Sequence, residues 1–271
     1  MAIPYFRHEI ITLFSQQISP YLLGVTAALI LPLWWIYKMT KIHRLNPLRM
    51  IGLTFVIIIG AFWGGRVFHY FGPWGAGWFQ YQGIFDLSQG GHVFYGGLIG
   101  ATIAGYVYLK LQNENAGTIA DLVAPAIPLG QFLSRLVSCF FMGDDFGTPS
   151  NLPWAIQFLG PGYQYLIGTT IHPVQIYLSL GNLLVFTILL ELRNYKQWEG
   201  QIFASYILLH GMMRFFLEFF RDTTESTATL IFGFTLTYSQ LISLILVLVS
   251  LLFILKKTQK EKKTVFLASK L

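Results

Sequence analysis

The sequence predicts an all-α polytopic membrane protein: a bundle of about seven transmembrane helices, with the amino terminus outside and the carboxyl terminus cytoplasmic. Three observations predict this class. Of the 271 residues, 54% are hydrophobic and 11% are charged, against roughly a quarter charged in an ordinary soluble domain. Several apolar stretches are long enough to cross a bilayer, which takes about 20 residues. Most of the basic residues lie in alternate loops, as the positive-inside rule requires.

The same composition excludes other classes of protein. The charged residues are too few to cover a soluble globular domain, and neither disorder nor nucleic-acid binding fits so apolar a chain. We find no charged start with a short apolar core and a cleavage site, so no cleaved signal peptide is expected. The single cysteine, Cys139, rules out an internal disulfide framework and leaves the redox compartment open. We expect it to be a buried helix residue.

The expected spans lie near 19–38, 50–71, 92–112, 118–142, 173–193, 200–221 and 235–255. The fourth contains Pro125, Pro128 and Gly130. Because proline removes a backbone donor and bends a helix, we expect a bent helix that faces the interior of the bundle. Residues 1–255 are predicted to form one transmembrane bundle, and 256–271 a basic cytoplasmic tail.

The positions of the basic residues predict the orientation. The predicted outer loops 72–91, 143–172 and 222–234 contain no Lys or Arg, whereas the predicted cytoplasmic segments hold 13 of the 18 basic residues. The Lys-rich tail is either a solvated flank of the last span, which we favour, or a contact with anionic lipid. Aromatic residues crowd the outer loops, and such rings favour the headgroup layer, so we expect the working face to be the outer one. The 13 residues are Lys38, Lys41, Arg44, Arg49, Lys110, Arg193, Lys196, Lys256, Lys257, Lys260, Lys262, Lys263 and Lys270.

Four further arginines lie in or at the ends of predicted spans: Arg66, Arg135, Arg214 and Arg221. Each arginine near a helix centre costs roughly 2.5–3.5 kcal/mol on insertion scales and usually faces a cavity or a partner. The acidic candidates inside the bundle, Asp121 and Glu218, are fewer than the arginines. We therefore expect an external anion. A phosphate is favoured because guanidinium groups bind its oxygens in a fork, and a phospholipid headgroup supplies phosphate at this depth.

The sixth span carries a polar stripe. His210, Arg214, Glu218 and Arg221 are spaced by four, four and three residues, which places them on one face of a helix. The alternative is that Arg214 and Glu218 neutralise each other and only hold the bundle together. We favour an anion site, because that pair would leave the other arginines without an evident acidic partner.

The glycine pairs and the acidic pair each have two interpretations. Gly64-Gly65 and Gly96-Gly97 either let helices approach closely or let backbone amides face a ligand. Asp144 and Asp145, in a short outer loop, suit a turn or helix cap better than a cation site.

The histidines are also open to two interpretations. His69, His92 and His172 fall near the outer ends of spans, and for each of them, as for His210, we favour a hydrogen-bonding role over that of a general acid or base. No spacing among them matches a zinc motif, so we predict no metal and no cofactor.

Several segments, taken in order, resemble the bacterial prolipoprotein diacylglyceryl transferase family from the second span to the seventh. Each is weak alone, but their order together with the predicted topology is specific. They are Gly64-Gly65-Arg66; Phe94-Tyr95-Gly96-Gly97-Leu98-Ile99-Gly100; Asp121 to Pro128 followed by Arg135; His172-Pro173-Val174-Gln175-Ile176-Tyr177; Arg214-Phe215-Phe216-Leu217-Glu218-Phe219-Phe220-Arg221; and Ser239-Gln240.

This resemblance implies an enzyme of the bacterial cytoplasmic (inner) membrane, with 1–255 as its catalytic bundle. It would transfer a diacylglyceryl group from phosphatidylglycerol to the thiol of the lipobox cysteine in a prolipoprotein signal peptide, forming a thioether and releasing glycerol phosphate. Arginines would stabilise the charge growing on the phosphate, and a base would take the thiol proton. Membrane lipids surround it, and nucleic acid is not expected. Two alternatives stay open: a divergent paralogue with another acceptor, or a non-catalytic lipid-binding protein.

The resemblance also implies roles for particular residues. Arg135 and Arg214 match the essential arginines of the family, Glu218 matches its acidic residue in the sixth span, and His210 and Tyr95 complete the expected catalytic set. The expected substrate-binding residues are Arg66, Gly96, Gly97, Asp121, Asp144, His172, Tyr177 and Arg221.

The chain departs from the family pattern around the proton-handling groups. Tyr95 stands where the family has His, and His210 where it has Tyr, so we hypothesise that these two roles have been exchanged. Ser138 replaces an asparagine and Leu23 a tyrosine. Asp144 or its neighbour is the nearest substitute for a signature glutamate, one residue out of register.

Overall fold

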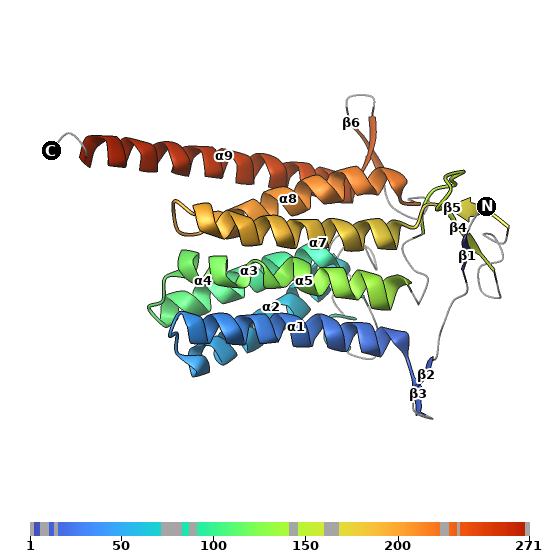
Figure 1. The fold of residues 1–271 in the computed structure, drawn as a ribbon, viewed down its shortest axis with the longest axis horizontal. Coiled ribbons are helices and arrows are strands. Elements are labelled where there is room, and N and C mark those ends of the chain that lie inside the picture. The colour runs from blue at the N-terminus through green and yellow to red at the C-terminus, as the bar shows by residue number, and fades with distance from the viewer. Residues whose placement is uncertain are drawn as a thin grey trace. The chain divides into compact units, whose positions relative to one another are not determined.

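The computed structural model of this chain is mostly helical (Figure 1). The chain forms two compact units: Met1–Trp35 together with Ala120–Leu271, and Ile36–Ile119. Each unit is described by itself. The residues that the structure describes are 3–5, 11–13, 16–71, 83–86, 91–140, 146–159, 168–222, 228–231 and 234–268.

Within these ranges, 6 helical stretches are long and apolar enough to cross a membrane, which confirms a polytopic all-α membrane protein. The expected span at 92–112 forms α3 (Phe94–Leu111), a helix rich in glycine and tyrosine that is not among the 6. The 6 comprise α1 (Pro20–Ile42), α2 (Pro47–Phe71), the stretch Ala116–Val137, α7 (Val174–Leu192), α8 (Gln201–Leu217) and α9 (Tyr238–Ala268). Helix α9 continues without a break through Lys256.

The fourth expected span is broken, as its prolines predict. It consists of α4 (Ala116–Val123), α5 (Ala126–Leu133) and a π-helix, Ser134–Cys139. Pro125 lies at the break and Pro128 in the first turn of α5, and both are fully buried, which confirms a bent helix facing the interior. The sequence does not predict the π-helix. Such turns occur frequently at functional sites, and this one contains Arg135.

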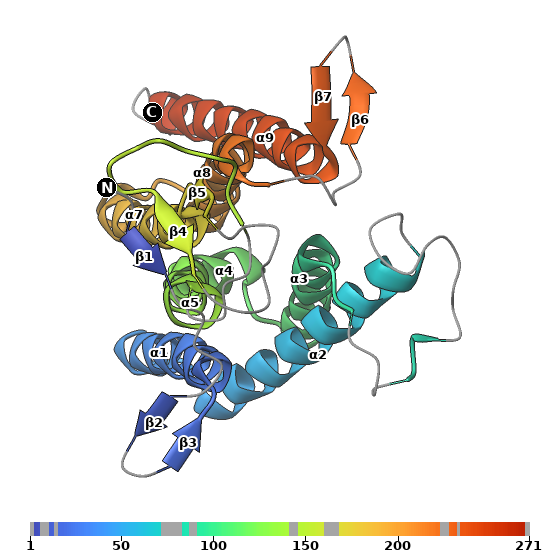
Figure 2. The ribbon, with the colours of Figure 1, turned by 90° about the vertical axis from the view of Figure 1, so that its right-hand side faces the viewer.

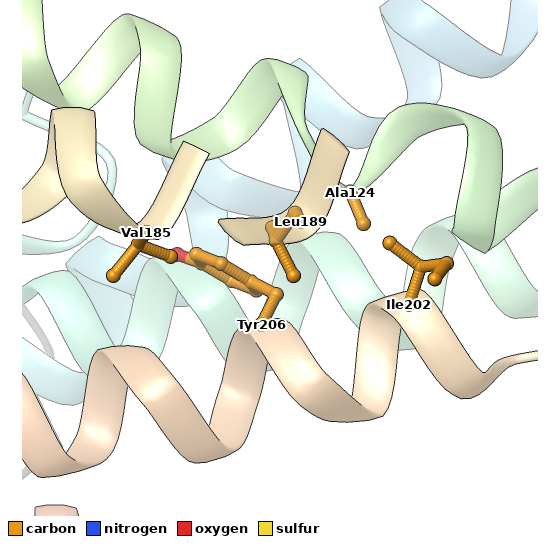
Figure 3. Packing of buried hydrophobic residues seen from close by; sticks show 5 residues of the cluster. All are labelled: Ala124, Val185, Leu189, Ile202 and Tyr206. Atoms are coloured by element: carbon orange, nitrogen blue, oxygen red, sulfur yellow. The ribbon is translucent and has the colours of Figure 1, made fainter. Parts of the chain in front are cut away.

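The core of the first unit lies where α7 and α8 meet the end of α4 (Figure 3). Ala124, Val185, Leu189, Ile202 and Tyr206 form this cluster, each exposed by no more than 4%. Because lipid is as apolar as these side chains, their contribution comes from close van der Waals packing rather than from exclusion of water.

In the second unit, α2 and α3 cross at their glycines. A methyl group at Gly100 would overlap the carbonyl oxygen of Gly60, and one at Gly96 would overlap that of Gly64. At Gly97 the nearest backbone oxygen is 3.2 Å from the added carbon. The structure thus gives these glycines a packing role, and ligand binding by Gly96 and Gly97 stays a prediction.

Short strands, which the sequence does not predict, lie at one end of the first unit (Figure 1 and Figure 2). Strand β1 pairs in parallel with β4, with Ile3 opposite Ile156, and β4 pairs antiparallel with β5. A hairpin of β6 and β7 leads directly into α9. The bounds are β1 (Ile3–Tyr5), β2 (Ile11–Leu13), β3 (Gln16–Ile18), β4 (Ile156–Phe158), β5 (Thr170–Ile171), β6 (Ala228–Ile231) and β7 (Phe234–Thr237).

Segments that the sequence assigns to the same side of the membrane are joined in this unit. On the predicted outer side, the Thr148 amide donates at 2.8 Å to the carbonyl of Phe220, at the outer end of the sixth span, and the His172 amide donates to the Thr148 carbonyl at 3.0 Å. On the predicted cytoplasmic side, the Trp198 ring donates to the Thr258 hydroxyl at 3.3 Å. At each end of the helices, these contacts therefore join segments that the charge pattern assigns to the same side of the membrane.

Candidate functional site

The site centres on Glu218, which begins a 3₁₀ turn directly after α8 and is 2% exposed. Arg214 Nη2 lies 3.0 Å from its Oε2, and Arg221 Nη1 lies 3.5 Å from its Oε1. The Thr237 hydroxyl donates to Oε1 at 3.2 Å. We call Arg214, Glu218, Arg221 and Thr237 the arginine cluster. The expectation that Arg221 lacks an acidic partner is wrong, because the 3₁₀ turn brings it back to Glu218.

The arginine cluster carries a net positive charge, because one carboxylate faces two guanidinium groups. The Glu218 side chain is 1% exposed, whereas those of Arg214 and Arg221 are 14% and 28% exposed. The negative charge is thus enclosed and the positive groups lie nearer the surface. Such an arrangement attracts an anion and presents guanidinium groups to it.

His210 extends the cluster by one turn of α8. It is 5% exposed, and its ring lies 5.5 Å from that of Tyr206. Both Arg214 and Arg135 act on it electrostatically, although Arg135 comes from the π-helix rather than from α8. The structure therefore brings together four of the residues predicted to be catalytic: Arg135, His210, Arg214 and Glu218.

A second polar group stands at the same end of α8. Trp154 Nε1 donates to the Tyr177 hydroxyl at 2.7 Å, and that hydroxyl lies 3.3 Å from His172 Nδ1. The Phe220 ring packs against both residues, with centroids 5.1 Å from His172 and 6.0 Å from Tyr177. His172 and Tyr177 were predicted as site residues, whereas Trp154 was not.

The Tyr177 hydroxyl joins Trp154 and His172 in one hydrogen-bond chain. The Tyr177 oxygen accepts from Trp154 Nε1 and shares a second hydrogen bond with His172 Nδ1, in which either group can be the donor, because a phenol oxygen can accept two bonds. Burial lowers the pKa of His172, which keeps the ring neutral at pH 7.

Arg66, in the second unit, is 1% exposed and holds a segment of backbone. Its Nε donates to the Ile84 carbonyl at 2.7 Å, and its Nη2 donates to the carbonyls of Gly83 and Asp86 at 2.6 and 2.7 Å. The structure thus gives Arg66 a role in anchoring residues 83–86 to α2, which the sequence does not predict. Phosphate binding by Arg66 stays a prediction.

Two more residues of interest belong to the second unit. Tyr95 lies in the first turn of α3, is 6% exposed, and packs edge-on against Phe94 with centroids 5.5 Å apart. The pKa of His92 is lowered by burial and, to a smaller extent, by the nearby charges of Arg66 and His69.

Asp121 lies at the opposite end of α8 from the arginine cluster. Its carboxylate accepts from the amides of Gly200 and Phe203 at 2.8 and 3.0 Å and pairs with Lys196 at 2.9 Å, so it caps the first turn of α8. Phe203 and Arg214 are separated by about 16 Å along the helix, at 1.5 Å per residue. The structure therefore does not bring Asp121 to the cluster, and its part in substrate binding stays a prediction.

Two of the predicted features fall wholly or partly outside what the structure describes. Asp144 lies outside the described residues, together with its neighbour Asp145. The backbone of Cys139 ends the π-helix, and the structure describes nothing of its side chain.

Thr237, like Trp154, is a site residue that the sequence does not predict. A signal for it exists, because Thr237-Tyr238-Ser239-Gln240 has the pattern of a capping box ahead of an apolar run. That pattern predicts the start of a helix. It does not predict contact with Glu218, which lies 19 residues earlier.

Fold and site together define a class: a polytopic helical membrane protein with an arginine-rich centre at the end of α8. Comparison with known proteins then gives the family. The chain belongs to the prolipoprotein diacylglyceryl transferase family, whose pattern it matches over residues 8–256. The resemblance found in the sequence is thereby confirmed.

Relatives of known name share much of the length. The phosphatidylglycerol–prolipoprotein diacylglyceryl transferase of Finegoldia magna is 31% identical over 246 residues, which cover 90% of this chain and 93% of that protein. The enzyme of the same name from Clostridioides difficile is 35% identical over 182 residues, or 67% of each chain. That of Mannheimia succiniciproducens is 33% identical over 205 residues, or 74% of each.

Proposed function

We propose that this protein transfers a diacylglyceryl group from phosphatidylglycerol to the lipobox cysteine thiol of prolipoproteins. Its family and the names of its relatives support this activity. The observation that carries the proposal is the arginine cluster, where two guanidinium groups share one enclosed carboxylate and the surplus positive charge suits a phosphate.

The proposed reaction is a displacement at the glyceryl carbon. The cysteine sulfur forms the new C–S bond as the C–O bond to phosphate breaks, and glycerol phosphate leaves with the electron pair. Arg214 and Arg135 would bind the phosphate and stabilise the negative charge that grows on it, which is most effective in a water-poor site. The thiol proton passes to a base, for which His210 and Tyr95 are the candidates.

We also propose that the protein lies in the bacterial cytoplasmic membrane, with its amino terminus outside and its carboxyl terminus in the cytoplasm. The lysines of α9 beyond the apolar stretch, together with Lys196, support this orientation. The arginine cluster then lies at the outer face, where a secreted prolipoprotein presents its signal peptide.

The proposal is tested with purified protein in phosphatidylglycerol vesicles, using a lipobox peptide as acceptor and thioether formation as the readout. The wild-type chain is expected to modify the peptide. Arg214→Ala and Arg135→Ala are expected to lower kcat by about 10²–10³, the usual cost of losing one group that stabilises transition-state charge.

The matched control is Arg49→Ala, which removes an exposed arginine whose partner is Glu114. This variant is expected to keep wild-type turnover. If Arg214→Ala and Arg135→Ala also keep it, the phosphate site is wrongly assigned.

A wild-type chain that binds phosphatidylglycerol but modifies no lipobox peptide would overturn the proposed reaction. That outcome would favour a lipid-binding protein or a different acceptor, as the departure at Tyr95 allows. Growth of a strain depleted of its own transferase, restored by this chain with modified lipoprotein present, would support the reaction in cells.

A further inference from the structure

We infer that Thr237 is a positioning residue for the arginine cluster: its hydroxyl holds the Glu218 carboxylate so that both Arg214 and Arg221 stay paired with it. This inference rests on the proposed function. Thr237 ends the β6–β7 hairpin and precedes α9, so it reaches Glu218 from another part of the chain. It is 6% exposed and Glu218 is 2% exposed, which leaves little room for water to replace the contact.

The hydrogen bonds of Thr237 determine where its proton goes. Its Oγ1 accepts from the Gln240 amide at 3.2 Å, and its own amide donates to Gln240 Oε1 at 3.0 Å. These two bonds form the reciprocal cap of α9. A hydroxyl has one proton to donate, and Glu218 Oε1, at 3.2 Å, receives it. Thr237 therefore links the start of α9 to the site.

The link fixes how Glu218 is shared. Oε2 faces Arg214, whereas Oε1 faces both Arg221 and Thr237. Guanidinium groups favour a two-pronged pairing with one carboxylate. Without the hydroxyl, the carboxylate can turn and offer both oxygens to a single arginine, which would change the direction of Arg214 toward a phosphate. Thr237 opposes this turn.

The test compares three variants in the vesicle assay with the lipobox peptide, measuring kcat and the KM for phosphatidylglycerol. Thr237→Val keeps the shape and removes the hydroxyl, and kcat is expected to fall roughly 10- to 100-fold, the usual worth of a hydrogen bond to a charged group. The KM is expected to change by less than about threefold, because the lost orientation acts mainly on the charge that grows during reaction. Thr237→Ser restores the hydroxyl and is expected to restore kcat.

Gln240→Ala is the control for the helix cap. It removes the side-chain half of the cap but leaves the Thr237–Glu218 bond, so the unfolding temperature is expected to fall while kcat stays within about threefold of wild type. A fall in kcat as large as that of Thr237→Val would mean that Thr237 acts only as a cap, and would overturn the inference. If Thr237→Val does not reach the membrane, Thr237→Ala is used in its place. The kcat of Gln240→Ala is then compared with the kcat of Thr237→Ala by the same criterion.

Two other outcomes also overturn the inference. One is wild-type kcat in Thr237→Val, and the other is an equal fall in Thr237→Ser. The wild-type chain is assayed before any variant. If it transfers no diacylglyceryl group to the peptide, the proposed function itself is refuted.

Discussion

Glu218→Gln removes the negative charge that pairs with both arginines of the cluster while keeping the size of the side chain. Glu218 makes ion pairs of 3.0 and 3.5 Å and accepts a hydrogen bond from Thr237, with its side chain 1% exposed. Removing one partner of a buried ion pair costs about 3–5 kcal/mol, because the other charge remains in a poorly solvated position. We expect a loss of free energy of unfolding of that order.

The loss is measured as a shift in the unfolding temperature of detergent-purified protein, followed by the helical circular dichroism signal. At roughly 2–4 °C per kcal/mol for a chain of about this size, Glu218→Gln is expected to lower the midpoint by on the order of 10 °C. Arg221→Gln removes the longer and more exposed pair, at 3.5 Å with 28% of the side chain exposed, and is expected to cost about 1 kcal/mol or less.

The matched control is Glu114→Gln, the same substitution in the pair with Arg49, whose side chains are 27% and 44% exposed. An exposed pair contributes about 0–1 kcal/mol, so this variant is expected to unfold near the wild-type temperature. If Glu218→Gln shifts the midpoint no more than Glu114→Gln does, Glu218 is not the enclosed centre of the cluster and the assignment of the site fails.

Two further predictions concern other parts of the molecule. Gly100→Ala places a methyl group against the carbonyl oxygen of Gly60, and such overpacking costs about 1–3 kcal/mol; the unfolding temperature should drop more than in Gly97→Ala, and equal shifts would contradict the helix crossing. Burial lowers the pKa of His172 below its ordinary value of 6.5, so below about pH 6.5 the unfolded chain binds the proton more readily and stability falls with falling pH. Unfolding temperatures at pH 7.5 and 5.5 should therefore differ less in His172→Gln than in the wild-type protein, and an unchanged difference would refute this account.

The elements that depend on local pattern were predictable from the sequence. The spans follow from runs of apolar residues, because the bilayer fixes the length of helix that it accepts. The bend after α4 follows from its prolines, and the shared face of His210, Arg214 and Glu218 follows from the helical repeat. The family resemblance was also readable, since it rests on the order of short segments.

Contacts between distant residues were not predictable in the same way. Arg66 reaches carbonyls 17 to 20 residues away, and Asp121 caps a helix 79 residues later. Trp154 donates a hydrogen bond to Tyr177, which lies 23 residues later in the sequence. No periodicity encodes these pairings, because each depends on how separate helices and loops come together.

By itself the sequence predicted a polytopic helical membrane protein, its expected orientation and its family. It also identified the arginines within predicted spans, which mark the candidate site. Those properties are set by composition and by neighbours along one helix. The tertiary structure decided which charges pair. Arg221 pairs with Glu218, Asp121 pairs with Lys196 away from the arginine cluster, and Thr237 donates a hydrogen bond to Glu218. The physical reason is that a buried charge must be balanced by the groups that packing places around it, and packing is a property of the whole fold.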